Sequence, residues 1–321
     1  MCTAITYKTK HHYFGRNLDV EFSYHEKMII APRAFPYRSF KNMNPHYAIV
    51  GIGSVIDDYP LFYDGTNEHG LSMAGLYFPG NGEYATTKPE AKNIPPYDFI
   101  PLILSQCKTV EEARVLVGKI NLAYISFRDD IPPSPLHWII ADKHQSIVVE
   151  PLGGELKIWD NPVGVLTNNP PFDFHLYNLS NYINLTREEP ENRFSKKLNI
   201  APYSRGMGAI GLPGDLSSAS RFVRAAFTKF NSISYETENC SISQFFHILD
   251  SVSQQRGCAK VNGKYEMTVY SSCCNTDKGI YYYKTYENNQ INAVYLFHEN
   301  LDTEALCVYN LNNTQQIYDI N

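Results

Sequence analysis

The sequence predicts an α+β fold built on antiparallel sheets, and two observations lead to this class. Short apolar runs follow one another along most of the chain, often separated by only a few polar residues, as in hairpins. Helical patterns are few and do not alternate with these runs, which argues against a doubly wound parallel sheet. No proline pair lies in a linker long or polar enough to divide the chain, so we expect one domain over residues 1–321.

The first two predicted strands form a hairpin at the amino terminus. Residues 2–7 and 12–19 read as strands, and the polar residues 8–11 between them read as the turn. A second hairpin is predicted where residues 143–145 join two apolar runs. The remaining strand candidates are 27–32, 46–54, 69–78, 136–142, 146–151, 155–159, 164–167, 266–272, 280–285 and 291–297.

Three segments carry the signals of a helix. Thr109 and Glu112 have the spacing of a capping box, as do Ser241 and Gln244, and each pair opens a candidate helix. A third segment begins at Ser218 and repeats apolar residues at helical spacing. The predicted helices are 110–119, 218–230 and 242–254.

Composition and charge exclude several classes of protein. Hydrophobic residues make up 43% and charged residues 19%, as in a globular protein with a substantial core. The net charge is −5 and there is no basic cluster, so we expect no nucleic-acid partner. No stretch approaches the roughly 18 consecutive apolar residues of a membrane span. No basic region precedes a long apolar run at the start, so we expect a cytoplasmic protein without a secretory signal or membrane partner.

The seven cysteines are irregularly spaced and include no CxxC pair. Cys273 and Cys274 are adjacent but have no nearby Cys or His partners, which argues against a metal site. We therefore expect buried or reduced thiols rather than metal ligands.

Cys2 points most directly to chemistry. Its side chain is small enough for the enzyme that trims initiator methionine, and removal of Met1 would leave a thiol and a free α-amine on one residue. In model peptides such an amine has a pKa of about 7.7–8.0 and a thiol one of about 8.5. One residue would then supply a nucleophile and a base close to neutral pH, as in an N-terminal nucleophile. The alternative is that Cys2 is only a small residue at the chain start.

The predicted amino-terminal hairpin brings two charged residues back beside Cys2. A carboxylate at Asp19 can orient the new ammonium, and the guanidinium of Arg16 can favour the thiolate and hold an anionic group. The alternative is a surface Arg–Asp pair three residues apart, which is common and contributes little.

Several sequence blocks resemble the choloylglycine hydrolase family, which comprises bile salt hydrolases and penicillin V acylases within the N-terminal nucleophile hydrolases. The likeness is strongest to gut-bacterial bile salt hydrolases, and its blocks span nearly the whole chain in a specific order. They are MCTAITY and FGRNLD at the start, then NEHGLSMAGLYFPG, LHWIIAD, NPVGVLTNNP, GLPGDLSSASRFVRAAF, FFHIL and KGIYYYKTYENNQINAV.

The resemblance implies the four-layer αββα sandwich of that superfamily. It also implies hydrolysis of the amide bond of glycine- and taurine-conjugated bile salts, such as glycocholate and taurocholate, through an acyl-thioester on Cys2. No metal or organic cofactor is expected for this reaction. Family members are commonly homotetramers of bacterial origin, so a homo-oligomer is expected here.

The resemblance further assigns roles to individual residues. Asn168 matches the family's oxyanion donor, although an Asn-Pro turn is the simpler explanation from the sequence alone. Arg221 matches a second catalytic arginine, with Arg224 one helical turn on as the alternative. Asp19 would accept a hydrogen bond from the α-amine of Cys2.

Tyr77 lies where the family has either Asn or Tyr and would contribute a second group beside the oxyanion. Bile salt hydrolases often carry Asn there and penicillin V acylases Tyr, so a penicillin V acylase is the alternative within the family. By motif position, Leu18, Ile56 and Ile131 would line an apolar cleft for the steroid. A non-enzymatic steroid-binding protein is the alternative of another class, although such a protein would need no nucleophile at Cys2.

Overall fold

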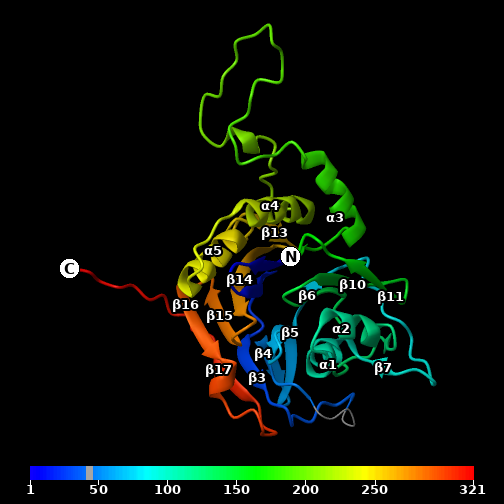
Figure 1. Ribbon diagram of the computed structural model, residues 1–321. Coiled ribbons are helices and arrows are strands. Elements are labelled where there is room, and N and C mark those ends of the chain that lie inside the picture. The colour runs from blue at the N-terminus through cyan, green and yellow to red at the C-terminus, as the bar shows by residue number, and fades with distance from the viewer. Residues whose placement is uncertain (41–45) are drawn as a thin grey trace.

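Two large antiparallel sheets face each other in the computed structural model, which describes residues 1–40 and 46–321 (Figure 1). The first sheet has the strand order β12-β1-β2-β14-β15-β16, with β13 paired to β14. Its strands are β1 (Cys2–Lys8), β2 (His12–Val20), β12 (Val165–Leu166), β13 (Ala259–Val261), β14 (Lys264–Asn275), β15 (Ile280–Thr285) and β16 (Asn288–Tyr295). The predicted amino-terminal hairpin is confirmed, and it lies in the middle of this sheet rather than at an edge.

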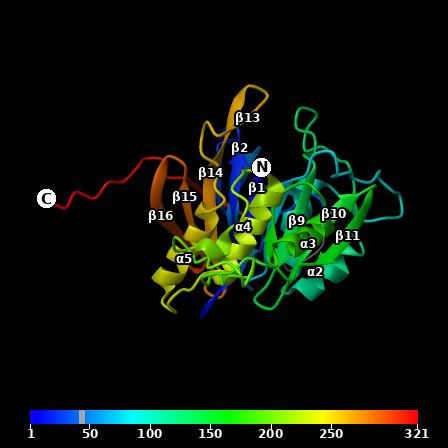
Figure 2. The ribbon, with the colours of Figure 1, turned by 90° about the horizontal axis from the view of Figure 1, so that it is seen from above.

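The second sheet has the order β11-β10-β9-β6-β5-β4-β3-β17 and lies beside the first when seen from above (Figure 2). Its strands are β3 (Lys27–Ala31), β4 (Ile49–Ile56), β5 (Tyr59–Asn67), β6 (Ser72–Tyr77), β9 (Leu136–Ala141), β10 (Ser146–Leu152), β11 (Glu155–Asp160) and β17 (Cys307–Asn310). A short parallel pair joins β7 (Asn93–Ile94) to β8 (Asn121–Leu122). The expected hairpin at 143–145 is confirmed between β9 and β10.

Helices cover the outer face of each sheet, so the expected four-layer αββα sandwich is confirmed (Figure 1). On the first sheet lie α4 (Ser218–Asn231) and α5 (Glu238–Asp250), which contact β1 and β14. On the second lie α1 (Phe99–Gln106) and α2 (Val110–Val117), which contact β5, β6 and β9. The segment α3 (Phe172–Asn178) leads from the β12 loop toward α4. No helix in the described ranges is long and apolar enough to cross a bilayer.

The central strands of the second sheet, such as β9 and β10, are buried on both faces, which explains their nearly continuous apolar runs. In β9, Ile139 faces the core between the two sheets, whereas Trp138 and Ile140 face α1 and α2. The ring of Phe99 on α1 packs edge-on against Trp138, with centroids 4.7 Å apart. The same alternation repeats in β10, where Val148 faces the first sheet.

Two of the three predicted helices are confirmed, and the start of the third is wrong. α4 begins at Ser218, and α2 is capped by Thr109, whose hydroxyl accepts from the N–H of Glu112 at 3.2 Å. The third helix, α5, begins at Glu238 because Thr237 caps it. Ser241 therefore lies inside the helix, where its hydroxyl forms a 2.8 Å hydrogen bond with Thr9 instead of capping.

A long segment between α3 and α4 extends away from both sheets, above α4 in the view of Figure 1. It contains the 3-10 turns Leu179–Tyr182 and Met207–Ala209. Several of its apolar side chains are exposed, among them Ile183, Phe194 and Tyr203. We refer to residues 183–210 as the arm.

Candidate active site

Cys2 begins β1, and side chains from two other parts of the chain hold its backbone. Its N–H donates to Oδ1 of Asn168 at 2.7 Å, and its carbonyl oxygen accepts from Nη1 of Arg221 at 2.5 Å. The residue is 2% exposed and pairs with Leu18 across the hairpin. The loop after β12 and the first turns of α4 therefore meet at the start of the chain.

Met1 continues the ladder of β1 beyond Cys2. The N–H of Asp19 donates to the carbonyl oxygen of Met1 at 2.9 Å, and the Met1 ammonium donates to the backbone oxygen of Asp19 at 2.7 Å. The same ammonium forms an ion pair with Glu266 on β14. While Met1 is present, the nitrogen of Cys2 is a peptide nitrogen, so the expected hydrogen bond from a free Cys2 amine to Asp19 stays a prediction.

Arg221 is fully buried at the centre of the site. Besides Cys2, its guanidinium donates to the hydroxyl of Thr3 at 2.7 Å and to Oδ1 of Asn168 at 2.8 Å. Nη1 also lies 3.9 Å from Oδ2 of Asp19. Burial lowers the pKa of Arg221 from its ordinary value, and the Asp19 carboxylate and the Cys2 thiol oppose that effect.

Arg224 points elsewhere, so the geometry favours Arg221 as the site arginine of α4. Its Nε donates to the backbone oxygen of Ser251 at 2.7 Å, and its Nη1 donates to those of Pro213 and Asp215 at 2.8 and 2.9 Å. These bonds fasten the start of α4 to the segments around it.

Arg16 lies on β2, also fully buried. Nη1 donates to the backbone oxygens of Gly75 at 2.6 Å and Tyr63 at 3.2 Å, whereas Nη2 has no hydrogen-bond partner among the described residues. Burial alone would lower the pKa of Arg16, but the nearby Cys2 thiol, Tyr270, Asp64 and Asp19 hold it above its ordinary value. The surface-pair alternative for Arg16 and Asp19 is therefore wrong, because both side chains are buried beside Cys2.

The Asp19 carboxylate is likewise fully buried. Oδ1 accepts from the hydroxyl of Thr268 at 2.6 Å, and Oδ2 has no hydrogen-bond partner in the described part of the chain. Burial raises the pKa of Asp19, against the opposing effect of Arg221 and the chain's ammonium. Asp19 thus has one free oxygen on the side that faces Arg221.

Asn168 is held rigidly in its loop. Its N–H donates to the hydroxyl of Ser218 at 2.8 Å, and its carbonyl oxygen accepts from Nε2 of His175 at 2.9 Å. Its side-chain Nδ2 donates to the backbone oxygen of Tyr77 at 2.6 Å. One Nδ2 hydrogen is left for another acceptor. Asn168 does lie in an Asn-Pro turn, and the turn aims its amide at Cys2.

Tyr77 contributes to the site through its backbone, since its carbonyl oxygen accepts a hydrogen bond from Asn168, and its ring is 46% exposed. The sequence does not single out Phe22 and Tyr24, which are also half-exposed. We refer to Tyr77, Phe22 and Tyr24 as the rim of the site. The ring centroids of Phe22 and Tyr24 are 4.8 Å apart. Burial raises the pKa of Tyr24, and Tyr77 and the Cys2 thiol add to that effect, so these groups are neighbours. The signal for them was the EFSY run directly after the first hairpin.

Among the residues expected to line the cleft, Leu18 is opposite Cys2 and 7% exposed. Ile56 is the last residue of β4, and Ile131 lies in the segment between β8 and β9. An ion pair between Asp57 and Arg128 joins these two parts of the chain at 3.1 Å. The N–H of Ile131 donates to the backbone oxygen of Arg128 at 3.0 Å, which closes a turn within that segment. Their contact with a ligand stays a prediction.

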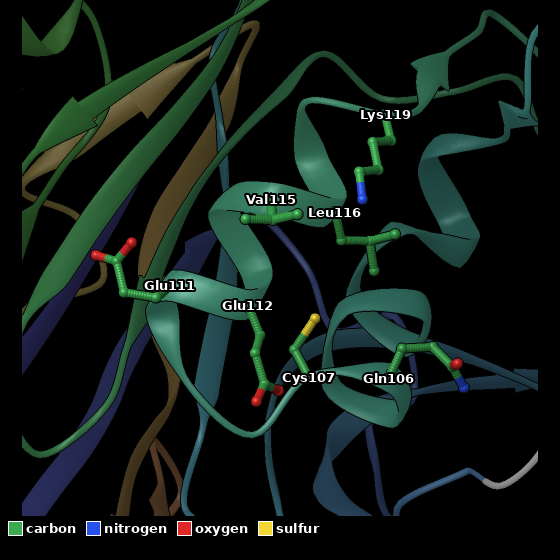
Figure 3. Close-up of a pocket in the computed structure, with 7 residues that line it drawn as sticks. All are labelled: Gln106, Cys107, Glu111, Glu112, Val115, Leu116 and Lys119. Carbon is green, nitrogen blue, oxygen red and sulfur yellow. The ribbon is translucent and has the colours of Figure 1, made fainter.

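Two hollows in the described surface lie away from Cys2. One, of about 490 Å³, is lined by Cys107 and residues of α2 on the outer side of the second sheet (Figure 3). Burial raises the pKa of Cys107 to about 12, so this thiol is not a second nucleophile. The other, of about 640 Å³, lies at the far end of β1 around Lys8 and His12. Within residues 1–40 and 46–321, no cluster of three or more His, Cys, Asp or Glu side chains is placed to hold a metal.

Comparison with known proteins gives consistent results. A model of the linear amide C–N hydrolases of the choloylglycine hydrolase family matches residues 2–309. The chain is 54% identical, over the full length of both proteins, to a bile salt hydrolase/transferase of Lactiplantibacillus plantarum, and 41% identical to one of Clostridium perfringens. A crystal structure of a mutant conjugated bile acid hydrolase from Clostridium perfringens superposes with a TM-score of 0.91, covering 100% of both chains at 39% identity. A penicillin V acylase from Agrobacterium tumefaciens, 20% identical and covering 99% of this chain and 94% of its own, shares the fold with a TM-score of 0.78.

Proposed function

The chain belongs to the choloylglycine hydrolase family of linear amide C–N hydrolases, and from that premise we propose that it hydrolyses glycine- and taurine-conjugated bile salts to the free bile acid and the amino acid. The observation that carries this proposal is the convergence of Arg16, Asp19, Asn168 and Arg221 on Cys2. The relatives named as bile salt hydrolases match over their full length, which supports the same substrate class here.

The proposed mechanism begins when Met1 is removed and the Cys2 amine becomes free. This amine takes the thiol proton, and the sulfur attacks the amide carbon to give a tetrahedral oxyanion. The amine then delivers the proton to the leaving nitrogen, which departs as glycine or taurine and leaves a thioester on Cys2. Water, deprotonated by the same amine, hydrolyses the thioester and restores the thiol.

Asn168 is proposed as the side-chain donor to the oxyanion. Its Oδ1 is held by the nitrogen of Cys2 and by Arg221, so the position of its amide is fixed relative to the sulfur. A preorganised donor of this kind stabilises the transition state by roughly 3–4 kcal/mol. Tyr77, the last residue of β6, is proposed to contribute a second group beside the oxyanion.

The two buried arginines are proposed to favour the thiolate and to attract the anionic end of the substrate. Nη2 of Arg16 has no hydrogen-bond partner in the part of the chain that the structure describes, and a guanidinium matches both carboxylate and sulfonate geometry. The apolar face of the steroid would pack on Leu18 and the half-exposed rim of Phe22 and Tyr24. Ile56 and Ile131 would extend that surface.

We also propose a homo-oligomer, as commonly found in the family, working in the bacterial cytoplasm. The exposed apolar side chains of the arm support self-association, because such residues on a projecting segment gain stability when another surface covers them. The seven cysteines are all free thiols, which suits a reducing compartment.

A penicillin V acylase is the second candidate, favoured by Tyr77 alone. A side-by-side measurement of kcat/KM for glycocholate, taurocholate and penicillin V separates the two. A conjugated bile salt buries more apolar surface than a phenoxy ring, at about 25 cal/mol per Å². We expect the bile salts to exceed penicillin V by at least about tenfold, which corresponds to ~1.4 kcal/mol. Equal or reversed values would make penicillin V acylase the better assignment.

A non-enzymatic steroid-binding protein makes a different prediction. Iodoacetamide alkylates Cys2, so an enzyme loses turnover, whereas a binding protein keeps its affinity for the steroid and shows no amine release with or without the reagent. Release of glycine from glycocholate that iodoacetamide abolishes is the result we expect.

A further inference from the structure

Glu266 is a buried carboxylate beside the site that the proposed mechanism does not use. It is 2% exposed, and its Oε1 binds the Met1 ammonium. Its Oε2 has no hydrogen-bond partner within residues 1–40 and 46–321. A buried carboxylate without a cation costs several kcal/mol, and among the described residues the cation that pairs with Glu266 is the Met1 ammonium.

The strand β14 presents Glu266 to the start of the chain together with Thr268. The two residues are two positions apart on a strand and therefore project from the same face. The hydroxyl of Thr268 holds Oδ1 of Asp19, and Thr268 pairs with Asp19 across the strands. This face of β14 thus supplies the carboxylate of Glu266 and, through Thr268, holds the carboxylate of Asp19 by a hydrogen bond.

Removal of Met1 would leave Glu266 without its cation, but it also creates a new one. The nitrogen atoms of Met1 and Cys2 are three covalent bonds apart and so less than about 4 Å from each other. One N–H of the new Cys2 ammonium takes the direction of the broken peptide bond, into the volume that Met1 leaves. Glu266 closes the far side of that volume, because it is the group that held the Met1 ammonium.

We infer that Glu266 is a positioning residue for the nucleophile, and that in the processed enzyme its carboxylate pairs with the α-ammonium of Cys2 across the space vacated by Met1. This inference rests on the proposed removal of Met1. Processing then moves a positive charge by one residue without leaving a buried carboxylate unpaired. Asn168 keeps its hydrogen bond from the same nitrogen, so the ammonium is oriented from two sides.

The sign of the effect on catalysis follows from the charges that face the amine. They are Asp19 and Arg16 on β2, Arg221 on α4, Glu266 on β14 and the Cys2 thiol itself, with the phenol of Tyr24 at the rim. A negative charge at Glu266 keeps the amine and thiol protonated to higher pH. Its removal should therefore move the titration of the amine–thiol pair to lower pH.

The test uses the full-length Glu266→Gln protein, which keeps the side-chain shape and loses the charge. Intact mass first establishes that Met1 is absent, and any retained Met1 is removed with methionine aminopeptidase. The pH dependence of kcat/KM for glycocholate and of the rate of Cys2 alkylation by iodoacetamide are then measured. We expect both profiles to shift to lower pH by at least about 0.5 units, as expected for loss of a charge a few ångströms away.

Two control variants isolate the charge. Glu266→Asp keeps a carboxylate and should restore the wild-type profiles at least in part. Glu238→Gln makes the same change at a carboxylate that binds Lys278 and Tyr282 instead, and should leave both profiles in place. Superimposable profiles for wild type and Glu266→Gln would overturn the inference. A shifted alkylation profile in a protein that fails to hydrolyse glycocholate would overturn the proposed substrate and keep the inference.

Discussion

Arg221 and Arg224 lie one helical turn apart on α4, and their surroundings give them different tasks. Arg221 is fully buried and binds Cys2, Thr3 and Asn168, whereas Arg224 binds three backbone oxygens away from the thiol. Lysine keeps the charge of an arginine but cannot reproduce the planar fork of donors. The pair therefore offers a matched comparison within one helix.

We predict that Arg221→Lys lowers kcat/KM for glycocholate by at least about a hundredfold, because lost hydrogen bonds to charged groups cost roughly 1.5–3 kcal/mol each. Arg224→Lys should stay within about threefold of wild type, since it loses only exposed or half-buried bonds. Steady-state kinetics on both variants decides the matter. A larger loss for Arg224→Lys would transfer the role to that residue.

The proposed nucleophile gives a second prediction at this scale. Cys2→Ala should abolish release of glycine from glycocholate while calorimetry still detects binding of the bile salt, because the thiol is not needed to hold the steroid. Cys258→Ala is the control, since Cys258 is an exposed free thiol, and it should keep full activity. Residual turnover in Cys2→Ala above one hundredth of wild type would rule out a covalent thioester.

The residues of the site differ in how far the sequence could reveal them. The local hairpin brings Arg16 and Asp19 back beside Cys2, although its spacing alone left a surface ion pair as an alternative. Asn168 and Arg221 were expected only from the family resemblance. Nothing in the sequence near Glu266 marks it, because its partner at the chain start is 265 residues away and only the pairing of β14 with β2 brings them together. Such groups become visible only when strand order is known.

The loop after β12 shows how elements aim a side chain. His175 on α3 donates to the carbonyl oxygen of Asn168 at 2.9 Å, and His137 on β9 donates to that of Thr167 at 2.9 Å. His137 also contacts the Glu150 carboxylate at 3.1 Å, which fixes its ring. A strand of the second sheet, β9, and the helix α3 thus hold the backbone carbonyls of Thr167 and Asn168 in place.

We predict that His175→Phe lowers kcat about tenfold with little change in KM, because Phe keeps the ring but leaves the buried oxygen of Asn168 unbonded, at a cost of roughly 1–3 kcal/mol. The ring of His175 stacks on Phe222 at 4.8 Å, and a phenyl ring fits that contact. His144→Phe on an exposed turn is the control. A change confined to KM would place the effect on substrate binding instead.

The same histidine predicts a pH dependence of stability. Burial lowers the pKa of His175 from 6.5 to about 4, so the unfolded chain binds more protons than the folded one between these values. Its contribution to stability is complete above pH 6.5 and is lost as the pH falls toward 4. Relative to His175→Phe, which lacks this titration, wild type should lose about 2 kcal/mol of unfolding free energy between pH 7 and pH 5. Urea unfolding of both proteins at the two pH values measures this loss. If the difference in unfolding free energy between wild type and His175→Phe is the same at pH 7 and pH 5, the prediction is wrong.

The accuracy of the element predictions depended on whether the signals were local. The first hairpin and α4 carry complete local signals and were predicted correctly. α1 was missed because Pro101 reads as a break, although a proline in the first turn of a helix removes no hydrogen bond. β5 was missed because Pro60 and Asp64 interrupt its apolar pattern, yet Asp64 is satisfied by Tyr270 at 2.5 Å and by Tyr281.

At the scale of the whole molecule, the strand succession predicted antiparallel sheets but not their layering. The order of the first sheet places β14 and β15, from near the end of the chain, directly beside the amino-terminal hairpin. The αββα arrangement was expected from the family resemblance alone, because periodicity cannot say which strands share a sheet. The central position of the hairpin is what buries Cys2 and surrounds it with charges from other elements.

The arm makes the prediction that belongs to the whole molecule. Ile183, Phe194 and Tyr203 are 86%, 83% and 86% exposed, although side chains of this size are usually covered in a stable assembly. If they pack on a second copy of the chain, Phe194→Asp should reduce the mass measured by size-exclusion chromatography with light scattering from an oligomer, expected to be a tetramer, toward smaller species. Lys197→Asp introduces the same acidic side chain nearby without removing an apolar one, and it should leave the mass unchanged. Because the arm is part of the segment that connects Asn168 to Arg221, we further expect loss of assembly to lower kcat rather than to leave the enzyme unaffected. A wild-type protein that is monomeric at micromolar concentration, or a Phe194→Asp variant of full oligomeric mass, would show that the arm has another role.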